Sequence, residues 1–79
     1  MKNIELYNNT FIKVFDVDEN KLNEKFTEKN IEFWDSLRQL AITNALEEKF
    51  DIMFDPEDIM EFNSYEKGKE ILKKYKIIL

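Results

Sequence analysis

The scarcity of glycine and proline limits the fold of this 79-residue chain more than any other feature of its sequence. The chain holds one residue of each kind, so it has no flexible linker, internal repeat or low-complexity tract. Helix boundaries must therefore be set largely by capping side chains. Because no segment has a sustained alternation of apolar and polar residues, the sequence predicts an all-α fold. The length allows one domain, spanning residues 1–79.

A stripe of apolar side chains predicts the first helix, from Asn3 to about Phe15. The stripe comprises Ile4, Tyr7, Phe11 and Phe15. Residues 16–34 are mostly charged and polar, with apolar anchors at no sustained period. Loops of this length are uncommon in compact domains, so we expect this one to be functional or to contain a short helical turn. Phe33 and Trp34 are expected to anchor it in the core.

Capping residues predict three further helices. Asp35 caps a second helix whose core face comprises Gln39, Ile42, Thr43, Ala45, Leu46 and Phe50. Asp55-Pro56-Glu57-Asp58 starts a short third helix, with Asp as the cap and Pro in the first turn, that reaches about Phe62. Asn63 or Ser64 caps a last helix in which Tyr65, Gly68, Leu72 and Tyr75 share a face. The predicted fold is a four-helix bundle of three longer helices and one short helix, with a long loop between the first two. Its expected core includes Ile42, Leu46, Ile52, Ile59, Phe62 and Leu72.

The chain has no cysteine and no histidine, which restricts its chemistry. A disulfide framework and a thiolate metal site are excluded, and a nucleophilic serine would lack its usual imidazole base. A calcium site around Asp51, Asp55 and Asp58 is not expected, because no twelve-residue loop with a glycine and a terminal glutamate is present. The sequence therefore indicates a protein that is not an enzyme and that has no metal site.

The negative charge is concentrated in one segment. The chain carries a net charge of −5, whereas residues 35–62 alone sum to −6. Such a surface attracts basic protein partners and disfavours nucleic acid, although an acidic face kept for solubility would give the same composition. Polar residues interrupt the first five positions, and no stretch approaches the roughly 20 apolar residues of a membrane span. We therefore expect a cytoplasmic protein without membrane insertion.

The second helix opens on Asp35-Ser36-Leu37, which forms part of a longer pattern. The tripeptide is followed by ALEEKFDI at residues 45–52, by Asp55-Pro56-Glu57-Asp58 and by a last helix. In order, spacing, length and local acidity, this pattern resembles the acyl carrier protein family across nearly the whole chain. The resemblance implies an acyl-carrier-like four-helix bundle in which residues 1–79 form a single carrier domain.

The resemblance also implies a cofactor on Ser36. A separate phosphopantetheinyl transferase would attach 4′-phosphopantetheine to the Ser36 hydroxyl, and the flanking Asp35 and Leu37 would belong to the same site. A phosphodiester in the first turn of a helix lies at the positive end of the helix dipole. The thiol of the arm would hold acyl groups as thioesters. The protein would act as a monomer that delivers this cargo to acyl-loading and acyl-transferring enzymes with basic docking surfaces.

Such partners would bind the second helix. Leu37 and Ala41 would supply a small apolar anchor, and Glu47 and Glu48 would meet Arg or Lys on the partner. Leu37 could equally be partly buried against the preceding loop, and the two glutamates could be solvated helix residues.

Two departures from the family pattern suggest a specialised pathway rather than general fatty-acid synthesis. Ile31-Glu32-Phe33-Trp34 replaces the usual Leu-Gly-small run, and Arg38 stands where an acid is common. Surface-sugar modification, a lipid variant or a secondary metabolite would fit.

Two alternatives remain open. An aminoacyl or peptidyl carrier would have the same arm with different cargo. A helical protein–protein interaction module would use the same surface with Ser36 unmodified.

Overall fold

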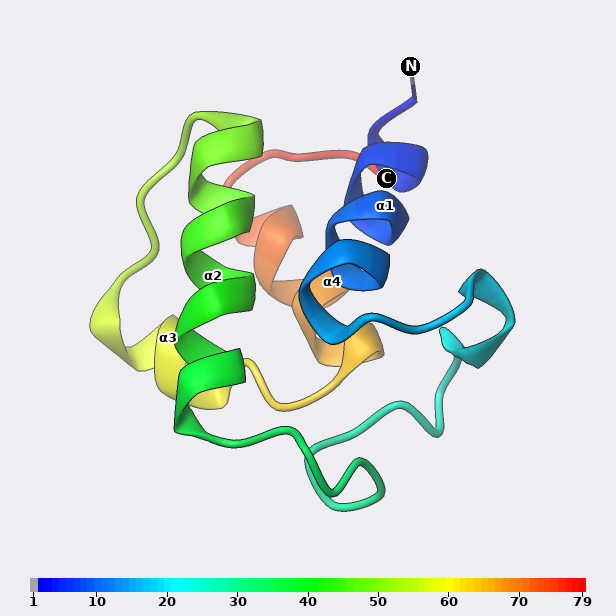
Figure 1. The fold of residues 1–79 in the computed structure, drawn as a ribbon. Coiled ribbons are helices and arrows are strands. Elements are labelled where there is room, and N and C mark those ends of the chain that lie inside the picture. The colour runs from blue at the N-terminus through cyan, green and yellow to red at the C-terminus, as the bar shows by residue number, and fades with distance from the viewer. Residues whose placement is uncertain (1) are drawn as a thin grey trace.

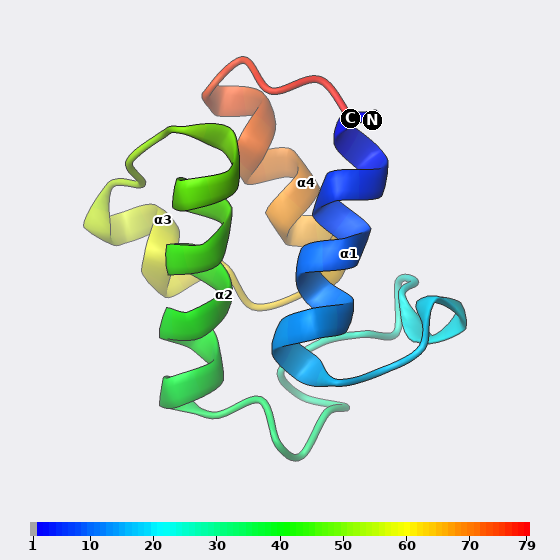
Figure 2. The same ribbon diagram turned by 45° about the horizontal axis from the view of Figure 1, so that its top comes forward.

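The computed structural model describes residues 2–79, and this range contains four α-helices and no β-strand. The helices are α1 (Asn3–Phe15), α2 (Ser36–Phe50), α3 (Pro56–Glu61) and α4 (Tyr65–Lys74), with a 3₁₀ turn, η1 (Glu19–Lys21), between the first two. α1 and α2 lie side by side and run in opposite directions, and α3 lies beside the first half of α2 (Figures 1 and 2). The predicted bundle of three longer helices and one short helix is therefore confirmed.

Aromatic side chains fill the core. Phe11 lies at the centre, with its ring centroid 5.4 Å from that of Tyr65, 5.9 Å from Phe26, 6.1 Å from Phe62 and 6.2 Å from Trp34. Each such pair adds about 0.5–1.5 kcal/mol beyond the apolar area that it buries. The rings come from α1, the long loop, the segment before α4 and α4 itself, so the packing of Phe11 ties these segments together.

The predicted core is largely confirmed. The apolar stripe of α1 is buried at Tyr7, Phe11 and Phe15. Of the six further residues expected there, four are buried (Ile42, Leu46, Phe62 and Leu72), whereas Ile52 and Ile59 are partly buried and pack against the cluster.

The long loop is held to the bundle by side-chain burial and by backbone hydrogen bonds. Phe26 and Trp34 are buried. The backbone N–H of Tyr65 donates to the Phe26 carbonyl at 2.9 Å, and an isolated antiparallel bridge joins Thr27 to Ser64. The η1 turn confirms the expected short helical turn. The prediction for Phe33 was wrong, because 44% of this residue is exposed and its ring only flanks that of Phe15.

The predicted caps have different outcomes. Asp35 caps α2 with its side chain, as predicted, and Ser64 rather than Asn63 caps α4. Asp55 occupies the cap position of α3, but its side chain makes no capping hydrogen bond. Pro56 has no N–H to donate, and the Asp55 main-chain carbonyl accepts from the Asp58 and Ile59 N–H groups instead.

The single glycine lies inside α4 rather than at a turn. A Cβ atom at Gly68 would overlap the Tyr7 hydroxyl and the Phe62 ring, so its missing side chain allows α4 to approach α1. Helices α1 and α2 instead end on a left-handed residue that is not glycine, Asp16 and Asp51 respectively, and Lys76, which follows the Tyr75 cap of α4, is also left-handed. Within residues 2–79, no helix combines the length and apolar character needed to cross a bilayer.

Candidate functional site

The site predicted from sequence lies at the start of α2. The Asp35 Oδ1 accepts a hydrogen bond from the backbone N–H of Arg38 at 2.9 Å, which satisfies one of the free N–H groups of the first turn. Ser36 is the first residue of the helix and is exposed. No residue of the described range forms a hydrogen bond with its hydroxyl. The Ser36 hydroxyl is thus accessible and lies where the helix dipole favours a negative group.

A surface hollow adjoins Ser36 on the side of α3. It has a volume of about 540 Å³. We call it the Ser36 hollow, and its lining residues are Glu28, Trp34, Asp35, Ser36, Gln39, Leu40, Ile59 and Met60. These residues come from the long loop, the start of α2 and α3. Parts of three segments therefore meet beside the Ser36 hydroxyl.

The Gln39 side chain joins these three segments. Its Oε1 accepts from the Trp34 Nε1 at 2.6 Å, and its Nε2 donates to the Ile59 main-chain carbonyl at 2.5 Å. We call this pair of hydrogen bonds the Gln39 strap. The helical period places Gln39 on the core face, but the strap was not predicted. The available signal was Trp34, whose indole N–H requires a partner when buried.

Exposed apolar side chains lie near Ser36 on α2 and α3. Leu37 is 73% exposed and Leu40 is 51% exposed on α2, whereas Met60 on α3 is 80% exposed. Leu40 and Met60 line the Ser36 hollow, and Ala41 is also exposed. We call this set the apolar surface, and its members are Leu37, Leu40, Ala41 and Met60. The sequence pattern that pointed to Leu37 and Ala41 gave no local signal for Met60, because its exposure depends on how the short α3 packs.

The two glutamates predicted to bind partners have different environments. Glu48 is exposed. Glu47 is half-buried, and its Oε2 accepts a hydrogen bond from the backbone N–H of Phe54 at 2.8 Å. Glu47 therefore holds the segment between α2 and α3 in place, and Glu48 is the more exposed of the two carboxylates.

Asp58 is the one member of the acidic segment that is buried. Its carboxylate accepts from Lys74 Nζ at 2.6 Å and from the Tyr75 hydroxyl at 2.5 Å. These two hydrogen bonds lower the pKa of Asp58, and the same contact with Asp58 raises the pKa of Lys74. The Tyr75 oxygen also accepts from the Asp55 N–H at 2.8 Å. This network fastens α3 to the end of α4, so Asp58 does not contribute to the acidic surface.

The exposed acids near the apolar surface are Asp35, Glu48, Asp51, Asp55, Glu57 and Glu61. They lie on α2, on α3 and on the segment between the two helices. In residues 2–79 there is no group of three or more acidic side chains placed to hold a metal ion. The exposed acids are therefore spread over these segments.

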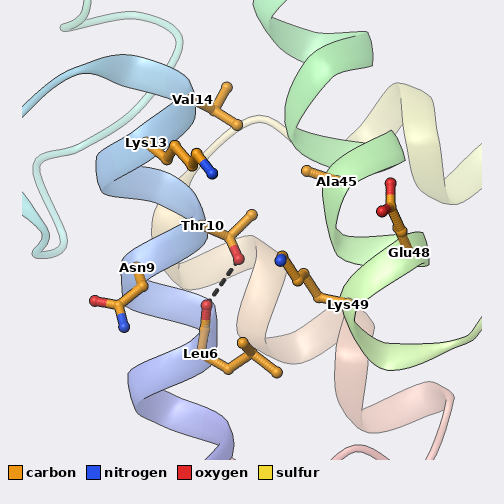
Figure 3. A pocket seen from close by; sticks show the side chains of 8 residues that line it. All are labelled: Leu6, Asn9, Thr10, Lys13, Val14, Ala45, Glu48 and Lys49. Carbon is orange, nitrogen blue, oxygen red and sulfur yellow. Dashed lines mark hydrogen bonds between the residues drawn. The ribbon is translucent and has the colours of Figure 1, made fainter.

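A second hollow lies between α1 and α2 (Figure 3). This α1–α2 groove has a volume of about 470 Å³ and is lined by Leu6, Asn9, Thr10, Lys13, Val14, Ala45, Glu48 and Lys49. Lys13 and Lys49 extend across the space between the helices, and Thr10 donates its hydroxyl hydrogen to the Leu6 carbonyl at 2.7 Å. Ser36 does not line this groove.

No protein-family model, curated protein or solved structure matches this chain. The interpretation of the site therefore depends on the geometry around Ser36 and on the sequence pattern that contains it.

Proposed function

We propose that the protein is a carrier protein, and that Ser36 is its attachment point for a 4′-phosphopantetheine arm. Within that class, we propose an acyl carrier protein that works as a cytoplasmic monomer in a specialised pathway. The observation that carries the proposal is the free, exposed hydroxyl of Ser36 in the first turn of α2, beside a cap that Asp35 supplies. The apolar surface and the exposed acids of α2 and α3 supply a place where modifying and loading enzymes can bind.

The attachment chemistry fits this position. The Ser36 oxygen attacks the phosphorus nearest the pantetheine of coenzyme A, the P–O–P bridge breaks, and 3′,5′-ADP leaves. The hydroxyl proton passes to a base of the transferase, since the chain has no histidine near Ser36 to take it. The new phosphodiester is stabilised by the α2 dipole by about 0.3–1 kcal/mol. The thiol of the arm, with an ordinary pKa of about 8.5, then forms the thioester with the cargo.

Partner recognition would divide between apolar and charged contacts. Leu37, Leu40 and Met60 present apolar surface that a partner can cover. Glu48 and the exposed acids of α3 lie on the same two helices, where they can meet basic side chains and accelerate association. Glu47 contributes by holding the segment that carries Met53 and Phe54.

Intact mass spectrometry tests the attachment. The protein is incubated with coenzyme A, Mg²⁺ and a broad-specificity phosphopantetheinyl transferase, and the mass should rise by one phosphopantetheine group. Ser36→Ala should show no gain. The chain has one other serine, Ser64, so Ser64→Ala is a matched control that should still gain the arm.

A helical interaction module is the second candidate function. The exposure of Leu37, Leu40 and Met60 favours it, because exposed apolar side chains that lie close together mark a contact area whether or not Ser36 is modified. A folded parent protein that gains no mass with transferases of both fatty-acid and peptide-synthesis type would favour this function. Gain of the arm followed by loading with amino acids alone would instead identify an aminoacyl carrier.

A further inference from the structure

We infer that the group carried by Ser36 stays outside the helical bundle, so that the cargo is a short or polar acyl group rather than a long hydrocarbon chain. This inference rests on the proposed function. It follows from three features of the structure: the Gln39 strap, the filled core behind it, and the open Ser36 hollow with acidic residues in its lining.

The Gln39 strap closes the direct path from Ser36 into the bundle. A chain entering from Ser36 would pass between α2 and α3, where Gln39 and Ile59 lie in the wall of the hollow. The Gln39 amide is bonded on one side to the Trp34 indole and on the other to the Ile59 carbonyl. Entry would break both hydrogen bonds, and the groups that lose their partners would then face an apolar chain.

The core behind the strap is filled. Ile42, Leu46 and Phe62 are fully buried. The Phe62 ring lies 6.1 Å from that of Phe11 and 6.2 Å from that of Phe54, measured between centroids. Extra methylene groups in so closely packed an interior force side chains out of their preferred rotamers. A long chain would therefore have to displace the aromatic cluster that ties α1, the loop and α4 together.

The Ser36 hollow is open to solvent and has acidic residues in its lining. Glu28 and Asp35 line it and are exposed, and Gln39 adds a polar side chain. Half of its lining residues are apolar, and of these Leu40 and Met60 are exposed. A long alkyl chain lying in this open hollow would remain largely in water and beside charge, whereas a short, hydroxylated or aminated acyl group would lose little by staying there.

Acyl groups of increasing length test the inference on the loaded protein. Acetyl-, butyryl-, octanoyl- and dodecanoyl-coenzyme A are used with the transferase, and the melting temperature and backbone amide NMR shifts of each product are measured. We expect the four melting temperatures to coincide and the Ile42 and Phe62 amides to stay unshifted. A melting temperature that rises with chain length, together with shifts at these two amides, would overturn the inference.

Chemical labelling of a cysteine variant tests this inference independently of the proposed function. The chain has no cysteine, so Ser36→Cys provides a single thiol that methyl and octyl methanethiosulfonates convert to mixed disulfides with loss of methanesulfinate. The same melting temperature is expected for both adducts, even if no transferase modifies the parent. Failure to gain the arm contradicts the proposed function alone, whereas stabilisation by the octyl group contradicts the inference alone.

Variants at Gln39 test the strap itself. In the Ser36→Cys background, Gln39→Ala removes the strap and leaves space, so the octyl adduct should now shift the Ile42 and Phe62 amides. Gln39→Met keeps the side-chain length without the hydrogen bonds, and it replaces Gln39→Ala if that variant does not fold. Unshifted amides in the folded variant would show that the strap does not close the path.

Discussion

The two serines of the chain stand at the starts of two helices, and they differ by one position relative to the cap. Ser64 precedes α4, and its Oγ accepts a hydrogen bond from the Lys67 N–H at 2.9 Å. Ser36 lies one residue inside α2, because Asp35 occupies the cap. One hydroxyl is therefore part of the scaffold, while the other is left free at the positive end of a helix. The register of the cap decides whether such a serine is structural or available for modification.

The two serines also differ in how buried their surroundings are. Ser64 is half-buried, pairs with Thr27 in the isolated bridge, and is followed by the buried Tyr65. Ser36 is exposed and is followed by Leu37, the most exposed leucine of the apolar surface. Substitutions near Ser64 should therefore change stability, and substitutions near Ser36 should change binding and modification.

Among substitutions in and around α4, Gly68→Ala is expected to have the largest effect on stability. Alanine favours a helix over glycine by about 1 kcal/mol. The new Cβ would overlap the Tyr7 hydroxyl and the Phe62 ring, and such overpacking costs about 1–3 kcal/mol or more. Urea denaturation should therefore show net destabilisation. Glu70→Ala, on the exposed side of the same helix, is the control and should stay within about 0.5 kcal/mol. A more stable Gly68→Ala would mean that helix propensity outweighs the contact.

Tyr75→Phe is expected to have the next largest effect, because it removes hydrogen bonds at the other end of α4. The variant loses the hydrogen bond that the Tyr75 hydroxyl donates to Asp58 and the one that it accepts from the Asp55 N–H. We expect this loss to cost about 1–2 kcal/mol at neutral pH. Burial and the bond to Asp58 raise the pKa of Tyr75, so this phenol is protonated at neutral pH.

The difference between the parent and Tyr75→Phe should depend on pH. The pKa of Asp58 is lowered in the folded protein, so its stabilising contribution is present above the ordinary value of 3.8 and is lost as pH falls through the lowered value. The stability difference should be constant between pH 5 and 8, a range above the ordinary carboxylate pKa of about 3.9, and should shrink in more acidic solution. A difference that grows on acidification would contradict the assigned network.

Ser64→Ala and Ser36→Ala compare the two serines directly. Loss of the Ser64 cap should destabilise the protein by about 1 kcal/mol. Loss of the Ser36 hydroxyl should change stability by no more than about 0.5 kcal/mol, because that hydroxyl holds no backbone group. Thermal or urea unfolding of both variants measures this contrast. Equal destabilisation would show that Ser36 also has a structural role.

Leu37→Ala should have the smallest effect on stability. The side chain is 73% exposed, so its removal should alter the free energy of unfolding by less than about 0.5 kcal/mol. The rate of phosphopantetheine attachment should nevertheless fall, as the proposed docking contact is lost. Ile42→Ala serves as the contrasting core variant, with an expected cost of about 2–5 kcal/mol. An unchanged attachment rate in Leu37→Ala would remove this residue from the proposed docking surface.

Features that depend on neighbouring residues could be predicted from the sequence. The α1 stripe, the Asp35 cap, the Asp55-Pro56 helix start and the final helix each involve residues within one or two turns of one another. Ser36 could be placed at a helix start for the same reason. Its proposed modification came from the order and spacing of motifs along the chain, which is a property of the sequence alone.

The tertiary structure decided which side chains are buried or paired and which stay exposed. Phe33 was expected in the core but is partly exposed, because Trp34 and Phe26 already fill the space beside Phe15. Asp58, Glu47 and Gln39 were assigned by helical position, yet their partners are Lys74, the Phe54 N–H and the Ile59 carbonyl. Those partners lie 7 to 20 residues away along the chain. A capping pattern acts over a single turn, whereas burial and pairing depend on which distant segments the packed core brings together.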